Sequence, residues 1–346
     1  MRRNTCLWRV CALIISICLL TSVASGCKST ALHAYSATYF DETFDTVLSV
    51  TVGAKNAEEA DTYCRAINSL VSDLHKQFHA YETYDGIHNL ATINAAESGT
   101  PVTVSDDLMA LLKLGQEAYF VTDGTVHIGM GALTSLWKNA ISTATLPSDE
   151  DIARAISASP ALDAMVLDDR AGTVTLMVPG MKLDAGAIAK GYVLERVRAY
   201  AAEVGIQSLL CNLGGEILAI GSAPDGENWE VAIADPDGGT LKRVRIKDAV
   251  VATGGDYERG FTVSGKRYHH VIDPATGYPA DSYRAATVIL PLESTALSDA
   301  YSTALMVLSA EGGEALAEKI SGLAYLRVPH GAPPETNVAW HQLLPV

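Results

Sequence analysis

The chain has 346 residues, with 25 lysine and arginine against 40 aspartate and glutamate residues, a formal net charge of −15 and 48% hydrophobic residues. This much apolar sequence is ample for a large core. The excess of acidic residues argues against nucleic acid as a partner and against binding of anionic lipids through a polybasic segment.

The N-terminus has the features of an export signal. Arg2, Arg3 and Arg9 form a positive region. The apolar run Val10–Leu20 is shorter than a typical transmembrane helix. We therefore expect residues 1–26 to be a signal peptide that is not part of the fold. Its removal leaves 22 basic against 40 acidic residues, a net charge of −18.

A small residue directly precedes Cys27, in the run Val23-Ala24-Ser25-Gly26-Cys27. Lipoprotein signal peptidase needs such a residue, because the diacylglyceryl-modified cysteine becomes the new N-terminus. Leucine is usual where Ala24 stands, so ordinary secretory cleavage nearby is the alternative. We predict lipidation of Cys27, a tether over residues 27–40 and a folded domain over residues 41–346. The protein would then lie at the cell membrane, anchored by lipid on the extracytoplasmic side (periplasmic or outer face).

Cysteine usage agrees with export. Cys27 would carry the lipid, and only Cys64 and Cys211 remain in the predicted domain. Two distant cysteines are not a disulfide framework, and both pairing and separate burial as small hydrophobes remain open. No CxxC or Cys/His cluster indicates zinc or iron.

The first half of the domain is predicted to contain one strand and three helices. Phe44–Val52 alternates as a strand. Asn56 and Glu59 resemble an N-cap and its N3 partner, and the apolar residues that follow recur at helical spacing to Phe78. Ser105 caps a second helix to about Phe120, and Ser148 caps a third to about Ser157.

From Val166 onward strands dominate. The predicted strands are Met165–Leu167, Val174–Val178, Leu209–Cys211, Ile217–Ile220, Val231–Ala234, Val244–Ile246, Val250–Thr253, Phe261–Val263, His269–Ile272 and Thr287–Leu290. Helices are predicted at about Ile188–Val204 and Ser298–Leu308. Strands in hairpins with segregated helices predict an α+β fold of one compact domain with antiparallel sheets.

The segment from Val250 to Ala280 is the densest in special residues. A strand leads into Gly254-Gly255, whose backbone permits close approach of a ligand. A basic, aromatic hairpin follows, and then His269 and His270 stand before a turn, which places a titratable group at a strand end. The alternative is a glycine-rich hairpin with a solvated turn.

A strand-to-helix junction lies at Leu183–Tyr192. Asp184 ends the strand, and small residues at the helix start expose backbone N–H groups that suit an anion, with Lys190 as an added charge. The spacing is not that of a Walker A loop. Tight packing of the helix on the strand explains the small residues equally well.

Asp299 and Thr303 are four residues apart on a predicted helix, so their oxygens point the same way. A carboxylate and a hydroxyl at this spacing suit Mg²⁺, and a backbone carbonyl from the glycine/alanine turn would complete the set. Alternatively, Asp299 stabilises a helix dipole. Asp123-Gly124-Thr125 and the Asn212–Glu216 run are further turns that plain turn chemistry also explains.

Taken together, these segments resemble the ApbE family, the FAD:protein FMN transferases. The resemblance runs in order over nearly all of the predicted domain. It covers Phe44-Asp45-Thr46 (commonly Met-Gly-Thr in the family), Tyr84-Asp85-Gly86 through Asn94, Asp123-Gly124-Thr125 to Trp137, LDAGAIAKGY at 183–192, NLGGEILAIG at 212–221, Asp235-Pro236, the block from Thr253 to Pro279, and Asp299–Ala304.

The resemblance implies a single ApbE-like domain, related to the T-fold, that binds FAD with Mg²⁺ on its diphosphate. FMN would pass to a Thr or Ser hydroxyl of an acceptor protein, such as a membrane redox-pump subunit or a secreted flavoprotein, with release of AMP. The implied metal ligands are the Ala187 carbonyl, Asp299 and Thr303, and the implied general base is His270. The implied FAD contacts are Phe44, Tyr84, Asp123, Gly124, Thr125, Asp184, Lys190 and, for the adenine, Ile272.

Two other activities remain open. An FAD pyrophosphatase that yields AMP and FMN would use the same metal and leaving group. A non-catalytic flavin-binding lipoprotein would need no intact site, and the presence of Asp184, Lys190, His270, Asp299 and Thr303 argues against it. Phe44-Asp45 and His88 depart from the family pattern, and both departures would tune flavin affinity or favour water over a protein acceptor.

Overall fold

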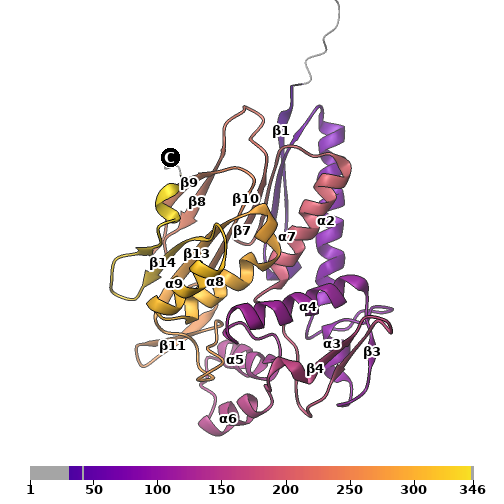
Figure 1. Cartoon of the computed structure of the whole chain (residues 1–346), viewed down its shortest axis with the longest axis vertical. Helices are drawn as coiled ribbons and strands as arrows, with labels where there is room; N and C mark the ends of the chain where they lie inside the picture. Colours follow the sequence, from indigo (N-terminus) through magenta and orange to yellow (C-terminus); the bar gives the residue numbers. More distant parts are fainter. Residues whose placement is uncertain (1–30, 41–42, 344–346) are drawn as a thin grey trace, which may run out of the picture. The chain divides into compact units, whose positions relative to one another are not determined.

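A computed structural model describes residues 31–40 and 43–343 (Figure 1). The predicted signal peptide and Cys27 lie outside these residues, so the processing of the N-terminus stays a prediction. The described residues from His33 onward belong to one compact unit. Within the described part of the chain, no helix has both the length and the apolar character needed to span a bilayer.

The described helices are α2 (Ala57–Phe78), α3 (Leu90–Ala95), α4 (Asp106–Val121), α5 (Gly131–Thr143), α6 (Asp149–Ser157), α7 (Ala189–Val204), α8 (Ser298–Val307) and α9 (Ala310–Lys319). The strands are β1 (His33–Tyr39), β2 (Leu48–Ala54), β3 (Val102–Thr103), β4 (Met165–Asp168), β5 (Thr173–Leu176), β6 (Leu209–Leu213), β7 (Glu216–Ile220), β8 (Trp229–Ala234), β9 (Thr240–Ile246), β10 (Ala249–Gly255), β11 (Gly260–Val263), β12 (Lys266–His269), β13 (Tyr283–Pro291), β14 (Ala324–Pro329) and β15 (Glu335–Thr336).

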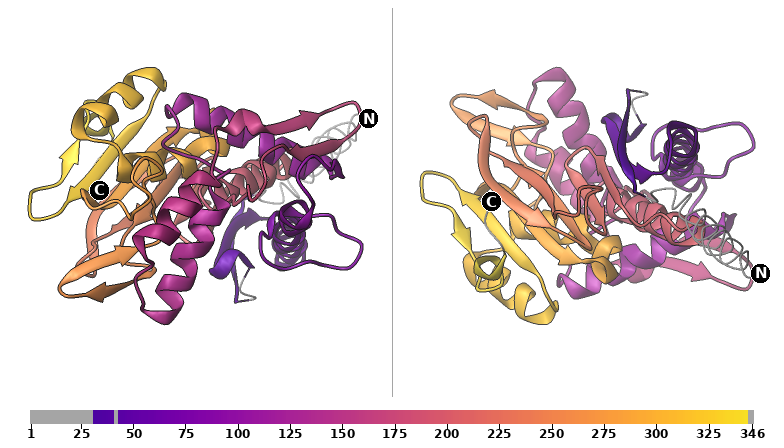
Figure 2. Two further views of the ribbon diagram at one scale, coloured as in Figure 1. Left: turned by 90° about the horizontal axis from the view of Figure 1, so that it is seen from below. Right: turned by 90° about the horizontal axis from the view of Figure 1, so that it is seen from above.

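The largest sheet has eight strands in the order β1-β2-β6-β7-β10-β13-β14-β15. Every neighbouring pair is antiparallel. Side chains alternate between its faces, so Val250 and Ala252 enter one hydrophobic cluster while Val251 enters another. Figures 1 and 2 show α2 alongside β1 and β2, and its buried residues belong to the same cluster as Val250 and Ala252.

Each face of this sheet has a different cover. The larger cluster includes buried residues of α2, α4, α7 and α8. On the other face the hairpin of β8 and β9 contributes Trp229, Val231 and Val244, together with Trp340 from the C-terminal segment. A third cluster joins α5 and α6 to the β11–β12 hairpin. The predicted α+β class is confirmed.

All five predicted helices are confirmed, and three of them have the predicted caps. The side chains of Asn56, Ser105 and Ser148 each accept a hydrogen bond from a backbone N–H three residues later. Three further helices were not predicted: α3 has only six residues, α5 begins at a glycine, and α9 contains two adjacent glycines.

Three local predictions are wrong. Residues 33–39, expected to be tether, form the edge strand β1, whose Tyr35, Ala37 and Tyr39 pack against the core. The strand predicted from Phe44 begins only at Leu48, since a 3₁₀ turn spans Thr43–Asp45. The strand expected at His269–Ile272 ends at His269, because the next residues enter a turn.

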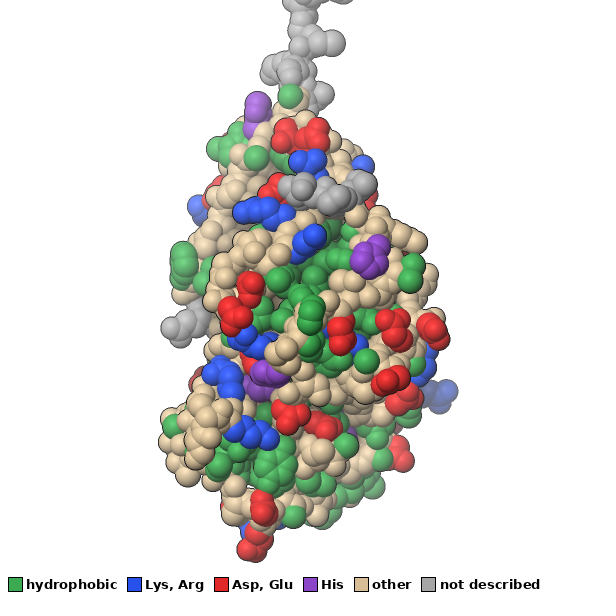
Figure 3. Space-filling view, turned by 90° about the vertical axis from the view of Figure 1, so that its left-hand side faces the viewer, with side chains coloured by type: hydrophobic (Ala, Val, Ile, Leu, Met, Phe, Trp, Pro, Cys, Tyr) green, Lys and Arg blue, Asp and Glu red, His purple; other side chains and the backbone are tan. Residues whose placement is uncertain are grey.

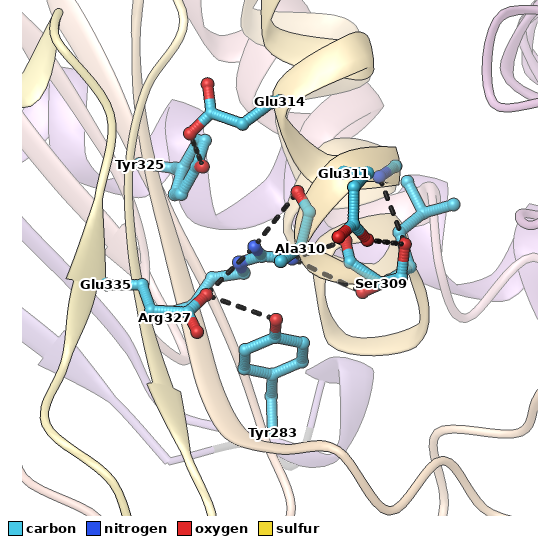
Figure 4. Close-up of polar contacts among 10 residues, drawn as sticks. Tyr283, Ser309, Ala310, Glu311, Glu314, Tyr325, Arg327 and Glu335 are labelled. Atoms are coloured by element: carbon cyan, nitrogen blue, oxygen red, sulfur yellow. Dashed lines mark hydrogen bonds and ion pairs between the residues drawn. The ribbon is translucent and has the colours of Figure 1, made fainter.

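A buried arginine secures the last helix and strands (Figure 4). Arg327 of β14 is 1% exposed and donates to the carbonyls of Leu308 and Ser309 at 3.2 and 3.0 Å. It also pairs with Glu335 of β15 at 3.0 Å and lies over the ring of Tyr283. Because these partners come from β13, β15 and the α8–α9 junction, Arg327 fixes the C-terminal elements to the sheet.

Candidate functional site

The start of α7 and the start of α8 meet at Asp299. Asp299 is buried, and its Oδ2 accepts a hydrogen bond from the backbone N–H of Lys190 at 3.3 Å, with the N–H of Gly191 also donating to the carboxylate. Helix α7 has no side-chain cap of its own at Ile188. Asp299 therefore acts as the cap of α7 from another element, and its charge complements the dipole of α7.

Lys190 connects Asp299 to a second buried carboxylate, Glu216. The Lys190 Nζ lies 3.3 Å from Oε1 of Glu216 and 4.0 Å from Oδ1 of Asp299. Burial lowers the pKa of Lys190, but the two carboxylates outweigh burial and raise the pKa above its ordinary value. Lys190 is thus an ammonium held between two acids, whereas we predicted a cation aimed at a bound anion.

Sequence reasoning missed Glu216, which we treated as part of a glycine turn. The signal was a single charged residue opening the apolar strand β7. Glu216 is fully buried, and its Oε2 has no hydrogen-bond partner among the described residues. Burial raises the pKa of Glu216, and Lys190 opposes this shift. If both carboxylates ionise beside one ammonium, the buried cluster carries an excess negative charge, and the raised pKa of Glu216 reflects the cost of that charge.

A cation such as Mg²⁺ in the site would favour the ionised form of Glu216 and Asp299 by opposing the cost of their burial. Thr303 is half-buried one helical turn after Asp299, and Ala187 lies in the turn that leads into α7. Within the described residues no group of three or more His, Cys, Asp or Glu side chains is arranged for a metal. A carbonyl, one carboxylate and one hydroxyl need no such group, because Mg²⁺ takes few protein ligands and keeps waters or phosphate oxygens.

The small residues of this junction have a packing explanation as well. A Cβ added at Gly191 would lie 2.7 Å from the carbonyl oxygen of Ala296, so only glycine lets α7 approach that segment this closely. Gly254 and Gly255 behave similarly, since added Cβ atoms would meet Met306 at 3.3 Å and the Tyr257 ring at 2.4 Å. The ligand approach that we predicted for Gly254-Gly255 is not needed to explain them.

Asp184 is held by groups that sequence reasoning did not identify. Its Oδ1 accepts from the backbone N–H of Gly186 at 2.8 Å, and its Oδ2 accepts from the Tyr81 hydroxyl at 2.5 Å. The Nζ of Lys138 lies 3.9 Å from the centre of the exposed Tyr81 ring. The strand predicted to end at Asp184 is not formed, since only an isolated bridge joins Lys182 to Met130. Asn94 bonds both backbone groups of Leu183, which fixes the segment that presents Asp184.

The Asp123-Gly124-Thr125 turn lies at the end of α4. Its backbone has positive φ at Asp123 and Gly124, and Asp123 pairs with Lys319 of α9 at 2.8 Å. A few residues after this turn, the Ile128 carbonyl accepts a hydrogen bond from the N–H of Asp184 at 2.8 Å. The segment that follows the turn therefore contacts Asp184, while the carboxylate of Asp123 pairs with a lysine.

Aromatic and histidine rings form a row from Phe44 to Tyr84. Phe44 lies edge-on to His75 at 5.1 Å, His75 lies 5.2 Å from His79, and His79 lies 5.9 Å from Tyr84. The predicted flavin contacts Phe44 and Tyr84 are thus at the two ends of one row. His88 is exposed and bonds the Thr103 carbonyl at 2.9 Å.

The two adjacent histidines have opposite environments. His269 is 2% exposed, its Nε2 bonds the Ala280 carbonyl at 2.5 Å, and its Nδ1 accepts from the N–H of Val271. His270 is half-buried, and its Nδ1 lies 3.4 Å from the carbonyl oxygen of Arg259. With Nδ1–H donating, the Nε2 lone pair of His270 is left to accept a proton.

The surroundings of His270 connect it to the buried cluster. Burial, followed by the positive charges of Arg259 and His269 and, more weakly, of Lys190, lowers its pKa to about 4. His270 is therefore a neutral base at pH 7, although a weaker one than the base with a pKa near 7 that we expected. Ile272, the predicted adenine neighbour, is 3% exposed and packs among Leu133, Trp137 and Phe261.

Charge on the surface is mixed. On the face drawn in Figure 3, hydrophobic side chains gather near the middle, and basic, acidic and histidine side chains surround them. Two cavities of about 270 and 300 Å³ lie around β15 and share Thr336. Neither is lined by Asp184, Lys190, His270 or Asp299, so both are separate from the candidate site.

Comparisons with known proteins identify the family of this chain. The sequence model of the ApbE family matches residues 44–326. The chain is 31% identical over 269 residues to an FAD:protein FMN transferase of Klebsiella pneumoniae, covering 77% of this chain and 83% of the relative. It is 30% identical over 341 residues to an FAD:protein FMN transferase of Treponema pallidum, covering 93% and 91%.

Solved structures give the same relationship. An ApbE protein of Thermotoga maritima superimposes with a TM-score of 0.80 at 28% identity, covering 90% of this chain and 99% of that one. The apo form of the flavinyl transferase ApbE from Pseudomonas stutzeri gives 0.77 at 28% identity, covering 90% and 97%. The chain therefore belongs to the ApbE family.

Proposed function

We propose that the protein is a Mg²⁺-dependent FAD:protein FMN transferase. The observation that carries the proposal is the buried cluster at the start of α7, where Asp299 accepts from the Lys190 N–H and the Lys190 ammonium lies between Asp299 and Glu216. A proton acceptor and a cation-binding cluster within one site match the needs of phosphoryl transfer, which are positioning, charge stabilisation and a base. The names of the two relatives support the same activity.

In the proposed reaction, the hydroxyl oxygen of an acceptor Thr or Ser attacks the FMN phosphorus of FAD. The bond from this phosphorus to the bridging oxygen breaks, AMP leaves, and the hydroxyl proton goes to Nε2 of His270. Arg259 contributes the carbonyl that keeps Nδ1 of His270 protonated. Tyr81 and the N–H of Gly186 hold the Asp184 carboxylate in one orientation at the strand end.

The carbonyl of Ala187, Asp299 and Thr303 would hold Mg²⁺, with Lys190 and Glu216 behind them. Mg²⁺ there would screen the diphosphate and stabilise the charge on the transferred phosphoryl group. In a mature chain with a net charge of −18, a diphosphate without such a cation would meet unfavourable charge.

We also propose that the acceptor lies outside the cytoplasm, as a membrane redox-pump subunit or a secreted flavoprotein, and that Cys27 carries the lipid anchor. The run of small residues before Cys27 supports the anchor. The proposed activity is tested by incubation with FAD, Mg²⁺ and a candidate acceptor, followed by separation of the flavin and nucleotide products. AMP released without an equal amount of free FMN supports transfer, whereas equal amounts of both indicate hydrolysis.

A further inference from the structure

An ion pair joins two segments of the candidate site that are 214 residues apart in the chain. The Nη1 of Arg259, in the loop between β10 and β11, lies 3.4 Å from Oδ2 of Asp45 in the 3₁₀ turn Thr43–Asp45. Neither residue is part of the buried cluster, and both side chains are at least half exposed. The pair therefore links the segment of the predicted flavin contact Phe44 to the loop beside His270.

Arg259 contacts both Asp45 and His270, but through different groups. Its guanidinium faces Asp45, while its carbonyl oxygen faces Nδ1 of His270 at 3.4 Å. The opposite end of the same loop is fixed at Asp256, whose N–H donates to the Arg284 carbonyl at 2.9 Å and whose carbonyl accepts from Arg267 Nε at 2.8 Å. The Arg259 end continues into β11, where Gly260 pairs with His269, and the Asp45 carboxylate is the side-chain partner of the Arg259 guanidinium.

The backbone at Asp45 points to a role for its side chain. Phe44 and Asp45 have φ of 55° and 56°, a left-handed conformation that favours glycine. The N–H of Phe44 donates to Nδ1 of His75 at 3.1 Å, which secures this turn to α2. A carboxylate is therefore kept at a position where glycine is conformationally better, and an unfavourable local conformation of this kind points to a role in function.

We propose that Asp45 is a positioning residue for flavin transfer, which holds Arg259 so that the Arg259 carbonyl orients His270. The inference rests on the proposed function. Asp45 touches neither the reacting phosphorus nor the acceptor hydroxyl, so its loss should affect the rate of transfer and leave FAD binding unchanged. An exposed ion pair has a modest effect, so we expect a decrease in kcat of about two- to five-fold.

The test compares Asp45→Gly, Asp45→Asn, Asp45→Glu and Arg259→Gln, with FAD, Mg²⁺ and the acceptor accepted by the wild-type protein. Asp45→Gly should lower kcat, keep KM for FAD, and keep or raise Tm, because glycine relieves the backbone. Asp45→Asn should lower kcat equally, and Asp45→Glu should retain most of the rate. If Asp45 had only a structural role, kcat would decrease only in those variants whose Tm also decreases.

A double-mutant cycle isolates the pair. Asp45→Asn combined with Arg259→Gln should be no slower than Arg259→Gln alone, because both changes remove the same interaction. Asp248, another aspartate with positive φ, bonds the N–H of Gly221 in a different turn. Asp248→Asn is the matched control and should keep the wild-type kcat.

Wild-type kcat in Asp45→Asn, or additive losses in the double variant, would overturn the inference and leave the proposed function intact. A wild-type protein that releases AMP but modifies no acceptor would instead contradict the proposed function, and the inference would fall with it.

Discussion

His269 and His270 are adjacent in the chain, with ring centres 6.5 Å apart at the end of β12, yet their surroundings differ. The ring of His269 is buried and bonded through both nitrogens, while His270 keeps Nε2 for a proton. The two rings therefore differ in environment at the point where β12 ends, and His270 keeps a nitrogen for the role of base that we propose.

Replacement of the two histidines should have different consequences. His270→Asn should keep FAD affinity within a small factor and slow transfer by about 10²–10⁴-fold, because the base is lost. His269→Asn should lower Tm instead, because two buried hydrogen bonds are disturbed. Transfer rates, FAD titrations and thermal unfolding of both variants measure this contrast, and a fast His270→Asn enzyme would place the base elsewhere.

The free energy of unfolding should decrease as the pH is lowered. The folded protein holds His270 neutral with a pKa of about 4, below the ordinary value of 6.5, mainly through burial. The unfolded chain therefore binds a proton more readily between these values. Stability present above pH 6.5 is lost down to about pH 4, by up to ~3 kcal/mol for this group. Between pH 4 and 7, the Tm of the wild type should depend more steeply on pH than the Tm of His270→Asn. Parallel plots of Tm against pH would contradict the assignment.

Asp299 is both the cap of α7 and a proposed metal ligand, so different substitutions should separate the two roles. Alanine at this position would remove the cap of α7 and a partner of Lys190, so Asp299→Ala should also destabilise the fold, by about 1 kcal/mol or more. Asp299→Asn keeps an oxygen for the Lys190 N–H and removes the charge. It should therefore remain folded and lose Mg²⁺-dependent turnover by orders of magnitude.

The measurements for Asp299→Asn are Tm, and AMP release over a range of Mg²⁺ concentrations. Thr303→Val is the companion variant, since it removes a hydroxyl from the same face of α8. Wild-type turnover in both variants, with unchanged Mg²⁺ dependence, would rule out these ligands.

The sequence predicted five of the eight described α-helices and most strands, because caps and apolar periodicity are local. Ser105 and Ser148 marked helix starts that the structure confirms. Contacts between distant segments were not predictable in this way. The burial of Glu216 and the hydroxyl of Tyr81 against Asp184, 103 residues away, depend on the packed sheet and helices. For the same reason β1 was missed, since its partner β2 supplies the pairing.

The lipid anchor is tested by Cys27→Ser. If Cys27 is lipidated, the wild-type protein should fractionate with membranes, and the variant should remain uncleaved or be released in soluble form. Membrane fractionation and the intact mass of the mature protein report both outcomes. Unchanged fractionation and mass in the variant would rule the anchor out.

The central claim is transfer of FMN to a protein hydroxyl. The most direct measurement is the intact mass of a candidate acceptor after incubation with this protein, FAD and Mg²⁺, beside an acceptor whose target Thr is replaced by Val. We predict an added FMN phosphoryl group on the Thr acceptor, none on the Val acceptor, and little with His270→Asn. Free FMN and AMP in equal amounts, with every tested acceptor unmodified, would contradict the claim and indicate an FAD pyrophosphatase.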